Sequence, residues 1–265
     1  MAPPRIVAIV LVRNEDRFLH RAITNVTAFC DEILIADHRS TDGTWEVAQE
    51  LARVHSHVRP HRIQDAREST EMIAPFAGTA TWLFGVDGDE IYDPAGLGRL
   101  RTQLFAGKFD PWWVVFGNVL NCTELEPARG FARGYLAPPC RSMTKLYNFR
   151  MVRQLDPSAP QRLHSHKGRD VFHEGFHALL RYELYKETAW EEAVFRCLHT
   201  CFLPRSSNEA SAAAARENVS ESLQPMRRLK RFARQMLGMK SSSDYKRAKY
   251  MRGLEVTVDT TPFFP

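Results

Sequence analysis

The sequence predicts an α/β fold in which a mostly parallel β-sheet is flanked by helices. The first observation is the continuous β-branched and aliphatic run from Arg5 to Val12, which is typical of a parallel strand buried on both faces. The second is the regular alternation of such runs with helical patterns over residues 5–100. Strand, helix, strand and helix at this spacing indicate right-handed βαβ units and therefore a parallel sheet.

In the first half of the chain, each expected strand is followed by helical or polar chain. Residues 16–29 place their apolar side chains on one helical stripe. A polar loop leads to a helix that starts near Thr44, and residues 66–78 are helical or irregular. The expected strands are residues 5–12, 32–36, 58–63 and 80–86.

The second half of the chain has a looser pattern. A helix is expected after Pro94 and a strand at residues 112–116. Apart from a strand-like piece at 145–149, residues 117–170 are rich in Pro, Gly, Arg and Asn, and long irregular stretches of this kind are usually functional loops. We further expect a short strand or turn and then a helix at 171–192, a strand at 194–199, and a basic helical segment at 207–252.

The composition is that of a soluble globular protein with a sizeable core. Of the 265 residues, 44% are apolar, which is enough for one large domain or a domain with an appendage. The 5 cysteines are odd in number and scattered, so we expect no disulfide framework and a reducing compartment. The longest apolar run near the start, Ile6–Val12, is too short to span a membrane, and no signal peptide precedes it. We therefore expect a cytoplasmic protein.

The formal net charge is +5, and basic side chains crowd residues 227–252. A basic segment favours anionic partners such as phosphates or a membrane surface. We therefore expect peripheral membrane association or a phosphorylated acceptor here, and no nucleic-acid partner. The competing interpretation is that these basic side chains form the solvated face of a helix whose other face packs on the core.

The strongest chemical signal is Asp87-Gly88-Asp89, which closes the apolar run at residues 80–86. Two carboxylates one residue apart at the end of a buried strand can converge on one divalent cation. In an open α/β sheet, ligands bind outside the carboxyl ends of the strands. The same tripeptide is also ordinary turn chemistry, so its neighbours along the chain decide between the two interpretations.

Three motifs in order, each at an expected strand end, resemble the signatures of the family 2 glycosyltransferases. The first is Ile9–Glu15, a strand that ends in Asn-Glu, and the second is Asp37–Thr44, an aspartate followed by Ser-Thr-Asp-Gly-Thr. The third, Asp87-Gly88-Asp89, resembles the DXD motif of the family. The resemblance covers residues 5–100 and implies the GT-A fold, a Rossmann-like, mostly parallel sheet, together with inverting transfer from a nucleotide-sugar.

The resemblance also implies the substrates and the organisation of the chain. We expect a UDP-, GDP- or dTDP-sugar donor, UDP first, with Mg²⁺ or Mn²⁺. We expect a hydroxyl acceptor, lipid-linked or phosphorylated, in cell-envelope glycan or secondary-metabolite biosynthesis. Residues 1–115 would form the nucleotide-sugar half, residues 116–206 the acceptor half of the same domain, and residues 207–265 a helical basic C-terminal extension.

The resemblance places the nucleoside against the first two strand ends. We expect Asp37 to contact the nucleoside together with the turn formed by Val12, Asn14 and Glu15. Competing structural interpretations exist for two of them, because Asn14 can simply form a turn and Glu15 can be an acid favoured near a helix start. Asp42 is expected to cap the helix that follows it.

The metal is expected at the third strand end. Asp89 would be its principal ligand, and Asp87 would support the ribose or the metal shell. By resemblance, a late histidine, His199, completes the metal or pyrophosphate site, since neutral imidazole can bind Mn²⁺; the competing interpretation is a core or surface histidine. A zinc site at Cys197, His199 and Cys201 is not expected, because no fourth ligand is evident.

Inverting transfer needs a general base for the acceptor hydroxyl, usually a carboxylate. The candidates in the second half of the chain are Asp156, Asp170 and Glu174. We favour Glu174, which lies between His173 and Gly175 near an expected helix start, and take Asp170 as the second choice. The competing interpretation is that Glu174 is only a helix-terminal acid.

Two other functions are compatible with parts of this pattern. A nucleotidyltransferase on a similar sheet would usually carry a Gly-rich phosphate loop after the first strand. The turn here is Arg13-Asn14-Glu15-Asp16, which has no glycine. A non-catalytic nucleotide- or sugar-binding protein on the same fold is the second alternative, which the intact Asp-Gly-Asp disfavours.

Overall fold

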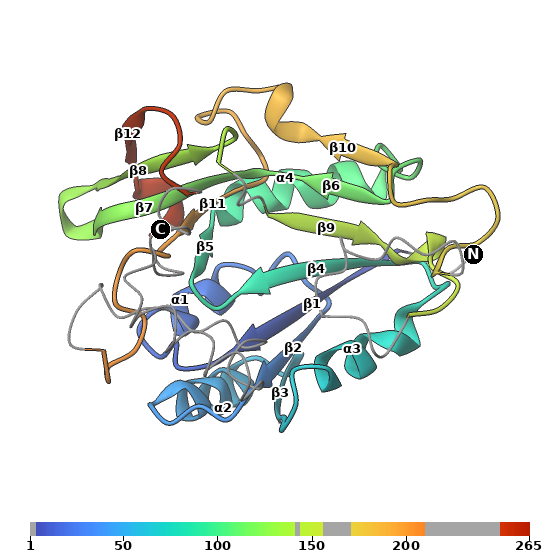
Figure 1. The fold of residues 1–265 in the computed structure, drawn as a ribbon, viewed down its shortest axis with the longest axis horizontal. Coiled ribbons are helices and arrows are strands. Elements are labelled where there is room, and N and C mark those ends of the chain that lie inside the picture. Colours follow the sequence, from blue (N-terminus) through green and yellow to red (C-terminus); the bar gives the residue numbers. More distant parts are fainter. Residues whose placement is uncertain (1–3, 141–143, 156–170, 210–249) are drawn as a thin grey trace, which may run out of the picture.

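Two β-sheets form the framework of the protein, and the computed structural model describes them through residues 4–140, 144–155, 171–209 and 250–265 (Figure 1). The larger sheet has the order β10 (Arg181–Glu183), β6 (Val114–Phe116), β9 (Lys145–Asn148), β4 (Thr81–Asp87), β1 (Arg5–Val12), β2 (Glu32–Asp37) and β3 (Val58–Arg62). The smaller sheet has the order β12 (Glu255–Asp259), β8 (Phe131–Ala137), β7 (Asn118–Glu126), β11 (Arg196–His199) and β5 (Glu90–Tyr92).

The parallel core of the larger sheet is the part that the apolar runs predict. Strands β4, β1, β2 and β3 are parallel neighbours, and β9 runs antiparallel to β4 and β6. The register pairs Val12 with Asp37 and Leu11 with Asp87. The carboxyl ends of β1, β2 and β4 therefore lie side by side, and the predicted α/β fold with a mostly parallel sheet is confirmed.

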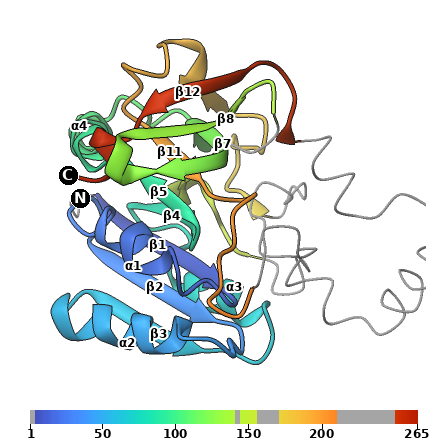
Figure 2. The ribbon, with the colours of Figure 1, turned by 90° about the vertical axis from the view of Figure 1, so that its left-hand side faces the viewer.

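Helices cover both faces of the larger sheet, as Figure 2 shows. Helices α1 (Leu19–Thr24), α2 (Thr44–Val54) and α4 (Pro94–Phe105) share a core cluster with Ile6, Ala8 and Val10, whereas α3 (Glu68–Ile73) shares a second cluster with Val7 and Ile9. Successive side chains of a strand point to opposite faces, so alternate residues of β1 supply the two clusters. This arrangement explains why the run from residue 5 to residue 12 is apolar throughout.

Helix α1 is shorter than the helix expected at residues 16–29. Its start is delayed because the chain just before it is bonded elsewhere: the backbone N–H of Arg17 donates to the carbonyl of Arg205 at 3.1 Å. After Thr24 the chain continues as turns, since Val26 and Phe29 donate to carbonyls three residues earlier. A long-range contact therefore sets the start of this helix, and local turns set its end.

The second half of the chain is more regular between residues 117 and 140 than the sequence predicts. Strands β7 and β8 form an antiparallel pair with an irregularity between Cys122 and Glu124. Only the first part of β7 is buried, so its apolar alternation is too short to indicate a strand. The expected helix within 171–192 was wrong, because β10 and a 3-10 turn at Leu184–Lys186 occupy that segment.

The C-terminus departs from the expected helical extension at residues 207–265. Strand β12 pairs antiparallel with β8, so the end of the chain belongs to the smaller sheet. Residues 210–249, which hold most of the expected basic segment, lie outside the described residues. None of the helices in the described part of the chain has the length and apolar character that a membrane crossing requires.

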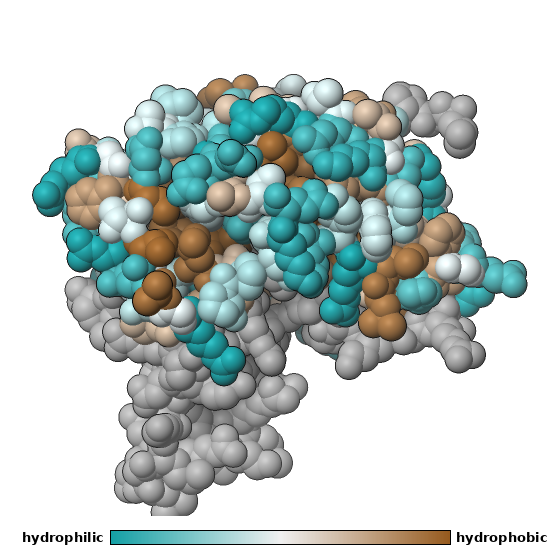
Figure 3. All heavy atoms as spheres, turned by 90° about the horizontal axis from the view of Figure 1, so that it is seen from above, coloured by the Kyte–Doolittle hydropathy of each residue, from teal (hydrophilic) through white to brown (hydrophobic). Residues whose placement is uncertain are grey.

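Two further features are the cysteines and the surface. All 5 cysteines lie in the described ranges and none forms a disulfide, as expected. Figure 3 shows the face that lies uppermost in Figure 1, where hydrophilic side chains share the surface with smaller apolar patches. Exposed apolar residues of this kind are normal for a folded protein.

A buried ion pair joins the smaller sheet to α4. Nε and Nη2 of Arg196 donate to Asp93 Oδ2 at 3.1 and 2.9 Å, and Nη1 donates to the carbonyl of Trp190 at 2.6 Å. Asp93 also caps α4, since its Oδ1 accepts from the N–H of Gly96 at 2.9 Å. The two side chains are 8% and 2% exposed, so loss of either leaves a buried charge without its partner.

We expect Arg196→Met to lower the free energy of unfolding by about 3–5 kcal/mol, because Asp93 would stay buried and uncompensated. The matched control is Arg53→Met on α2, where Arg53 pairs with Glu50 and is 73% exposed. That change should cost no more than about 1 kcal/mol, as is usual for exposed pairs. Urea unfolding of both variants measures the difference, and equal losses would contradict the buried pair's role.

Candidate active site

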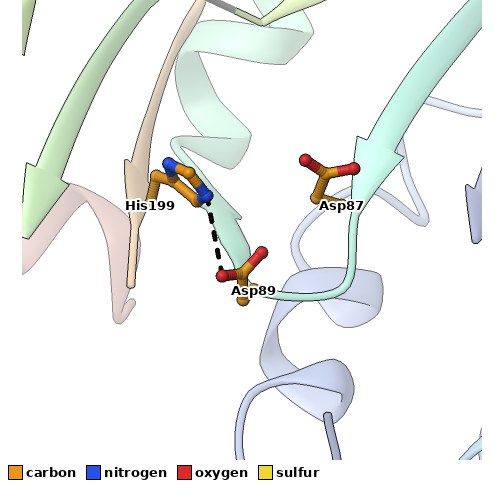
Figure 4. A group of neighbouring side chains, drawn as sticks. All are labelled: Asp87, Asp89 and His199. Atoms are coloured by element: carbon orange, nitrogen blue, oxygen red, sulfur yellow. Dashed lines mark ion pairs between the residues drawn. The ribbon is translucent and has the colours of Figure 1, made fainter. Parts of the chain in front are cut away.

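Two carboxylates and an imidazole meet at the carboxyl ends of the strands. Asp87 ends β4, Asp89 lies in the turn before β5, and His199 ends β11. One ligand atom from each lies within 4.8 Å of the others, and Figure 4 shows Asp89 and His199 pointing toward one another. The distance from His199 Nε2 to Asp89 Oδ2 is 3.6 Å. The structure thus brings together the three residues that the sequence analysis assigned to the metal and its surroundings.

This group fits a divalent cation. Oxygen ligands suit Mg²⁺, and two carboxylates with one neutral imidazole suit Mn²⁺. Asp89 and His199 are buried while Asp87 is exposed, so the group is anchored on one side and accessible on the other. Within the described ranges the group contains no cysteine, and burial raises the pKa of the Cys197 thiol well above its usual value. Cys197 and Cys201 are therefore not part of this group.

The turn that carries the aspartates is held from both sides. The carbonyl of Asp89 accepts from the N–H of Thr200 at 3.0 Å. The carboxylate of Glu90 accepts from the N–H of Asp87 at 3.2 Å and from the hydroxyl of Tyr92 at 2.7 Å. Burial and the nearby charge of Asp87 raise the pKa of Glu90. These bonds fix the turn before any ligand arrives.

Gly88 allows the turn to approach the first strand closely. A Cβ atom at this position would lie 2.4 Å from Glu15 Oε2 and 2.7 Å from Val12 Cγ1. Both distances are shorter than van der Waals contact, so any larger residue would push the turn away from β1. The glycine between the two aspartates is therefore required by packing.

Asp37, the expected nucleoside contact, ends β2 beside Val12. It has 0% exposure, and its Oδ1 accepts from the N–H of Ser40 at 3.1 Å. Its Oδ2 lies 3.6 Å from Arg62 Nε and makes no hydrogen bond to the described residues. This oxygen can still accept a hydrogen bond, but a ligand reaches it only if a neighbouring side chain moves.

Asn14 ties the loop after β1 to the loop after β2. It adopts a φ of 55°, its N–H donates to Ser40 Oγ at 3.0 Å, and its Oδ1 accepts from the N–H of Thr41 at 2.8 Å. Asparagine tolerates this left-handed conformation better than most residues. The contacts of Asn14 are therefore those of a turn-forming residue. The N–H of Glu15 donates to Thr44 Oγ1 at 2.8 Å, and Asp42 Oδ1 accepts from the N–H of Thr44 at 3.0 Å.

Arg205 is a residue of the site that the sequence analysis missed. Its Nη1 contacts Glu15 Oε1, and its Nε lies 3.9 Å from Asp89 Oδ2. The guanidinium is 13% exposed and is thus a nearly buried cation among the acids. The chain beside it is held by Ser206, whose Oγ donates to Asp42 Oδ2 at 2.6 Å. A single arginine beyond the last expected strand forms no motif, so no local signal indicates this position.

Glu174, the favoured general base, is not brought to this group. It lies in an exposed turn, and the ring of His173 packs against Gly78, just before β4 begins. Asp87 lies at the other end of the same strand. A strand rises about 3.3 Å per residue, which separates the two ends of β4 by roughly 20 Å. In the described residues 172–183 no helix begins, and the rival acids Asp156 and Asp170 lie outside the described residues.

Comparison with known proteins gives a family match. The model of a family described as "Glycosyl transferase family 2" matches residues 7–187. A search of curated proteins found no match.

Solved structures also show similarity. A mannosyltransferase from Pyrobaculum calidifontis in complex with GDP-Man and Mn²⁺ is 18% identical, with a TM-score of 0.33 over 47% of this chain and 37% of that one. Glucosyl-3-phosphoglycerate synthase from Mycobacterium tuberculosis, in complex with Mn²⁺, UDP and glucosyl-3-phosphoglycerate, is 16% identical, with a TM-score of 0.35 over 56% of this chain and 58% of that one. The chain thus spans less than two thirds of either protein.

We expect Gly88→Ala to destabilise the protein by about 1–3 kcal/mol, as overpacking usually does, and to weaken stabilisation by Mn²⁺. The reason is that the new methyl group would move Asp89 away from Asp87 and His199. Gly98→Ala on α4 is the matched control, because a Cβ atom there has no neighbour within 4 Å. Thermal unfolding with and without Mn²⁺ measures both effects. A Gly88→Ala variant with unchanged stability and an unchanged response to Mn²⁺ would contradict the packing argument.

Proposed function

We propose that this protein, which belongs to glycosyl transferase family 2 and is a glycosyltransferase, moves a sugar from a metal-bound nucleotide-sugar to a hydroxyl acceptor. The observation that carries the proposal is the group of Asp87, Asp89 and His199 at the carboxyl ends of β-strands. In open α/β sheets this edge is where ligands bind. Family membership establishes the class of enzyme, and the geometry supports the roles proposed below.

The proposed donor is a UDP-, GDP- or dTDP-sugar, with UDP first. Mn²⁺ or Mg²⁺ held by Asp87, Asp89 and His199 would neutralise charge on the diphosphate as it leaves. Arg205 is a second cation within 3.9 Å of Asp89, and we propose that it contacts the same diphosphate. Fixed positive groups that face developing negative charge are usually a large part of the catalytic effect.

The nucleoside end of the donor is proposed to lie against Asp37 and the turn from Val12 to Glu15. The paired ends of β1 and β2 form this part of the site. Asp37 Oδ2 is the acceptor proposed for a base or ribose hydrogen. Asp87, one strand away and exposed, is proposed to reach the ribose as well as the metal.

The proposed reaction replaces one bond at the anomeric carbon of the sugar by another. The acceptor oxygen forms a bond to that carbon as the bond to the β-phosphate oxygen breaks. The nucleoside diphosphate leaves with the electron pair, and the proton of the acceptor hydroxyl passes to a carboxylate base. Attack opposite to the leaving group inverts the configuration.

The base is proposed from the sequence candidates Asp156, Asp170 and Glu174, and of these the structure describes Glu174. Glu174 is the weaker candidate, because it lies near the end of β4 opposite to Asp87. A base must come within hydrogen-bond reach of the acceptor hydroxyl. Asp170, the second choice from the sequence, is then the remaining favoured candidate, and it lies outside the described residues. From the sequence we also propose a lipid-linked or phosphorylated acceptor. We further propose a cytoplasmic location, with association to the membrane surface through residues 227–252.

The test of the function is a panel of UDP-, GDP- and dTDP-sugars, with Mn²⁺ or Mg²⁺, in which hydrolysis or transfer is measured. We expect turnover with one nucleotide class and a loss of about 10²-fold or more in Asp89→Asn, since removal of a ligand charge weakens leaving-group stabilisation. Asp110→Asn is the control, because Asp110 is an exposed acid paired with Arg150. Nucleotide binding without any turnover would instead support the non-catalytic alternative, and full activity of a folded Asp89→Asn variant would refute the metal assignment.

We expect Glu174→Gln to keep turnover within about threefold of the wild type, because its position is remote from the aspartates. Asp170→Asn should fall by about 10²–10⁴-fold, the usual effect of losing a general base. Donor affinity should change little in either variant. If Glu174→Gln is inactive while it still binds donor, Glu174 is the base and the acceptor half must approach the strand ends during the reaction.

A further inference from the structure

A buried asparagine, Asn121, lies beside the proposed metal ligand His199. The register of the smaller sheet pairs Asn121 of β7 with His199 of β11 on one side and with Tyr135 of β8 on the other. Asn121 has 0% exposure and His199 has 4%. Paired residues on neighbouring strands project to the same face, so the sheet itself places the amide against the imidazole.

The orientation of this amide follows from two of its partners, and Cys201 Sγ also donates to its Oδ1 at 3.7 Å. Nδ2 of Asn121 donates to the carbonyl oxygen of Tyr135 at 3.3 Å, and Oδ1 lies 2.9 Å from Nδ1 of His199. A carbonyl oxygen can only accept hydrogen bonds, so the NH₂ end must face Tyr135. The oxygen end then faces the ring and also only accepts. Nδ1 of His199 must therefore carry the hydrogen of this bond.

This bond determines what the other ring nitrogen can do. In a neutral imidazole with its hydrogen on Nδ1, Nε2 carries a lone pair. That nitrogen lies 3.6 Å from Asp89 Oδ2, so two electron-pair donors face the same small space. A cation between them would accept both lone pairs. Metal-bound histidines commonly donate their second N–H to an oxygen acceptor, which sets both the tautomer and the orientation of the ring.

We propose that Asn121 is a positioning residue that holds His199 in the Nδ1–H tautomer and aims Nε2 at the metal. The inference rests on the proposed function, because it assumes that a cation occupies the group. Strand pairing alone does not require an amide at this position, since an apolar side chain of similar volume could fill it. A buried amide is costly unless its hydrogen bonds are made, and here one of them is made by the imidazole.

Two substitutions at this position separate positioning from structural support. Both Asn121→Leu and Asn121→Asp lose the bond from Nδ2 to Tyr135, so both should lower the melting temperature. Only Asn121→Asp keeps an oxygen that accepts from Nδ1 of His199. We expect Mn²⁺ affinity, measured by electron paramagnetic resonance with the preferred nucleoside diphosphate present, to fall by about 10–100-fold in Asn121→Leu. Asn121→Asp should stay within about threefold of the wild type.

The matched control is Asn148→Leu. Asn148 is also buried, its Nδ2 donates to the carbonyl of Asp110 at 3.1 Å, and its Oδ1 accepts from the N–H of Arg150 at 3.3 Å. It pairs with Trp82 near the far end of β4. This variant should lose stability and keep its Mn²⁺ affinity. Equal weakening of Mn²⁺ binding by Asn121→Leu and Asn121→Asp would show that Asn121 is only structural and would overturn the inference.

A second measurement needs no substitution at residue 121. Nitrogen-15 NMR of the histidine rings in the wild type, with the His199 signal assigned from a His199→Gln variant, should show the hydrogen on Nδ1. A hydrogen on Nε2 would overturn the inference. If Mn²⁺ binds to the wild type and equally to His199→Gln, the metal group itself is wrong, and the proposed function loses its metal site. If only His199→Gln loses Mn²⁺ while Asn121→Leu retains it, the metal site stands and the inference alone fails.

Discussion

Parallel pairing of β1 with both β2 and β4 is the constraint on which the site depends. Because the register pairs Val12 with Asp37 and Leu11 with Asp87, loops far apart in the sequence begin at the same edge of the sheet. The apolar side chains of β1 enter clusters on both faces and hold that register. A shift by one residue would exchange these faces, and the aspartates would no longer converge.

The same convergence gathers negative charge where there is little solvent. Glu15, Asp89 and Glu90 are all buried at this edge, and unpaired buried charges are costly. Three features compensate for this charge: Arg205 contacts Glu15 and approaches Asp89, the N–H of Asp87 donates to Glu90, and burial raises the pKa of Glu90. A divalent cation at Asp87, Asp89 and His199 would be a further compensation of the same kind.

The smaller sheet completes what the larger sheet begins. Strand β5 follows the Asp-Gly-Asp turn directly and pairs with β11, so Glu90 lies opposite His199. Strand β11 in turn pairs with β7, which supplies Asn121. Each step is a strand pairing, so the imidazole is positioned by backbone hydrogen bonds rather than by a loose loop. Sites supported in this way can be held accurately before a ligand binds.

The sequence by itself determined the features that depend on local pattern. Apolar runs and helical spacing predicted β1, β2, β4, α2 and α4, and motifs at the strand ends predicted where Asp37, Asp87 and Asp89 would lie, because ends of parallel strands must share one edge. Only the tertiary structure decided the features that depend on contacts distant in sequence. It brought Arg205 and Asn121 to the site, placed β12 in the smaller sheet and left Glu174 at the far end of β4. No local pattern encodes these positions, since each results from strand pairing or loop contacts between remote segments.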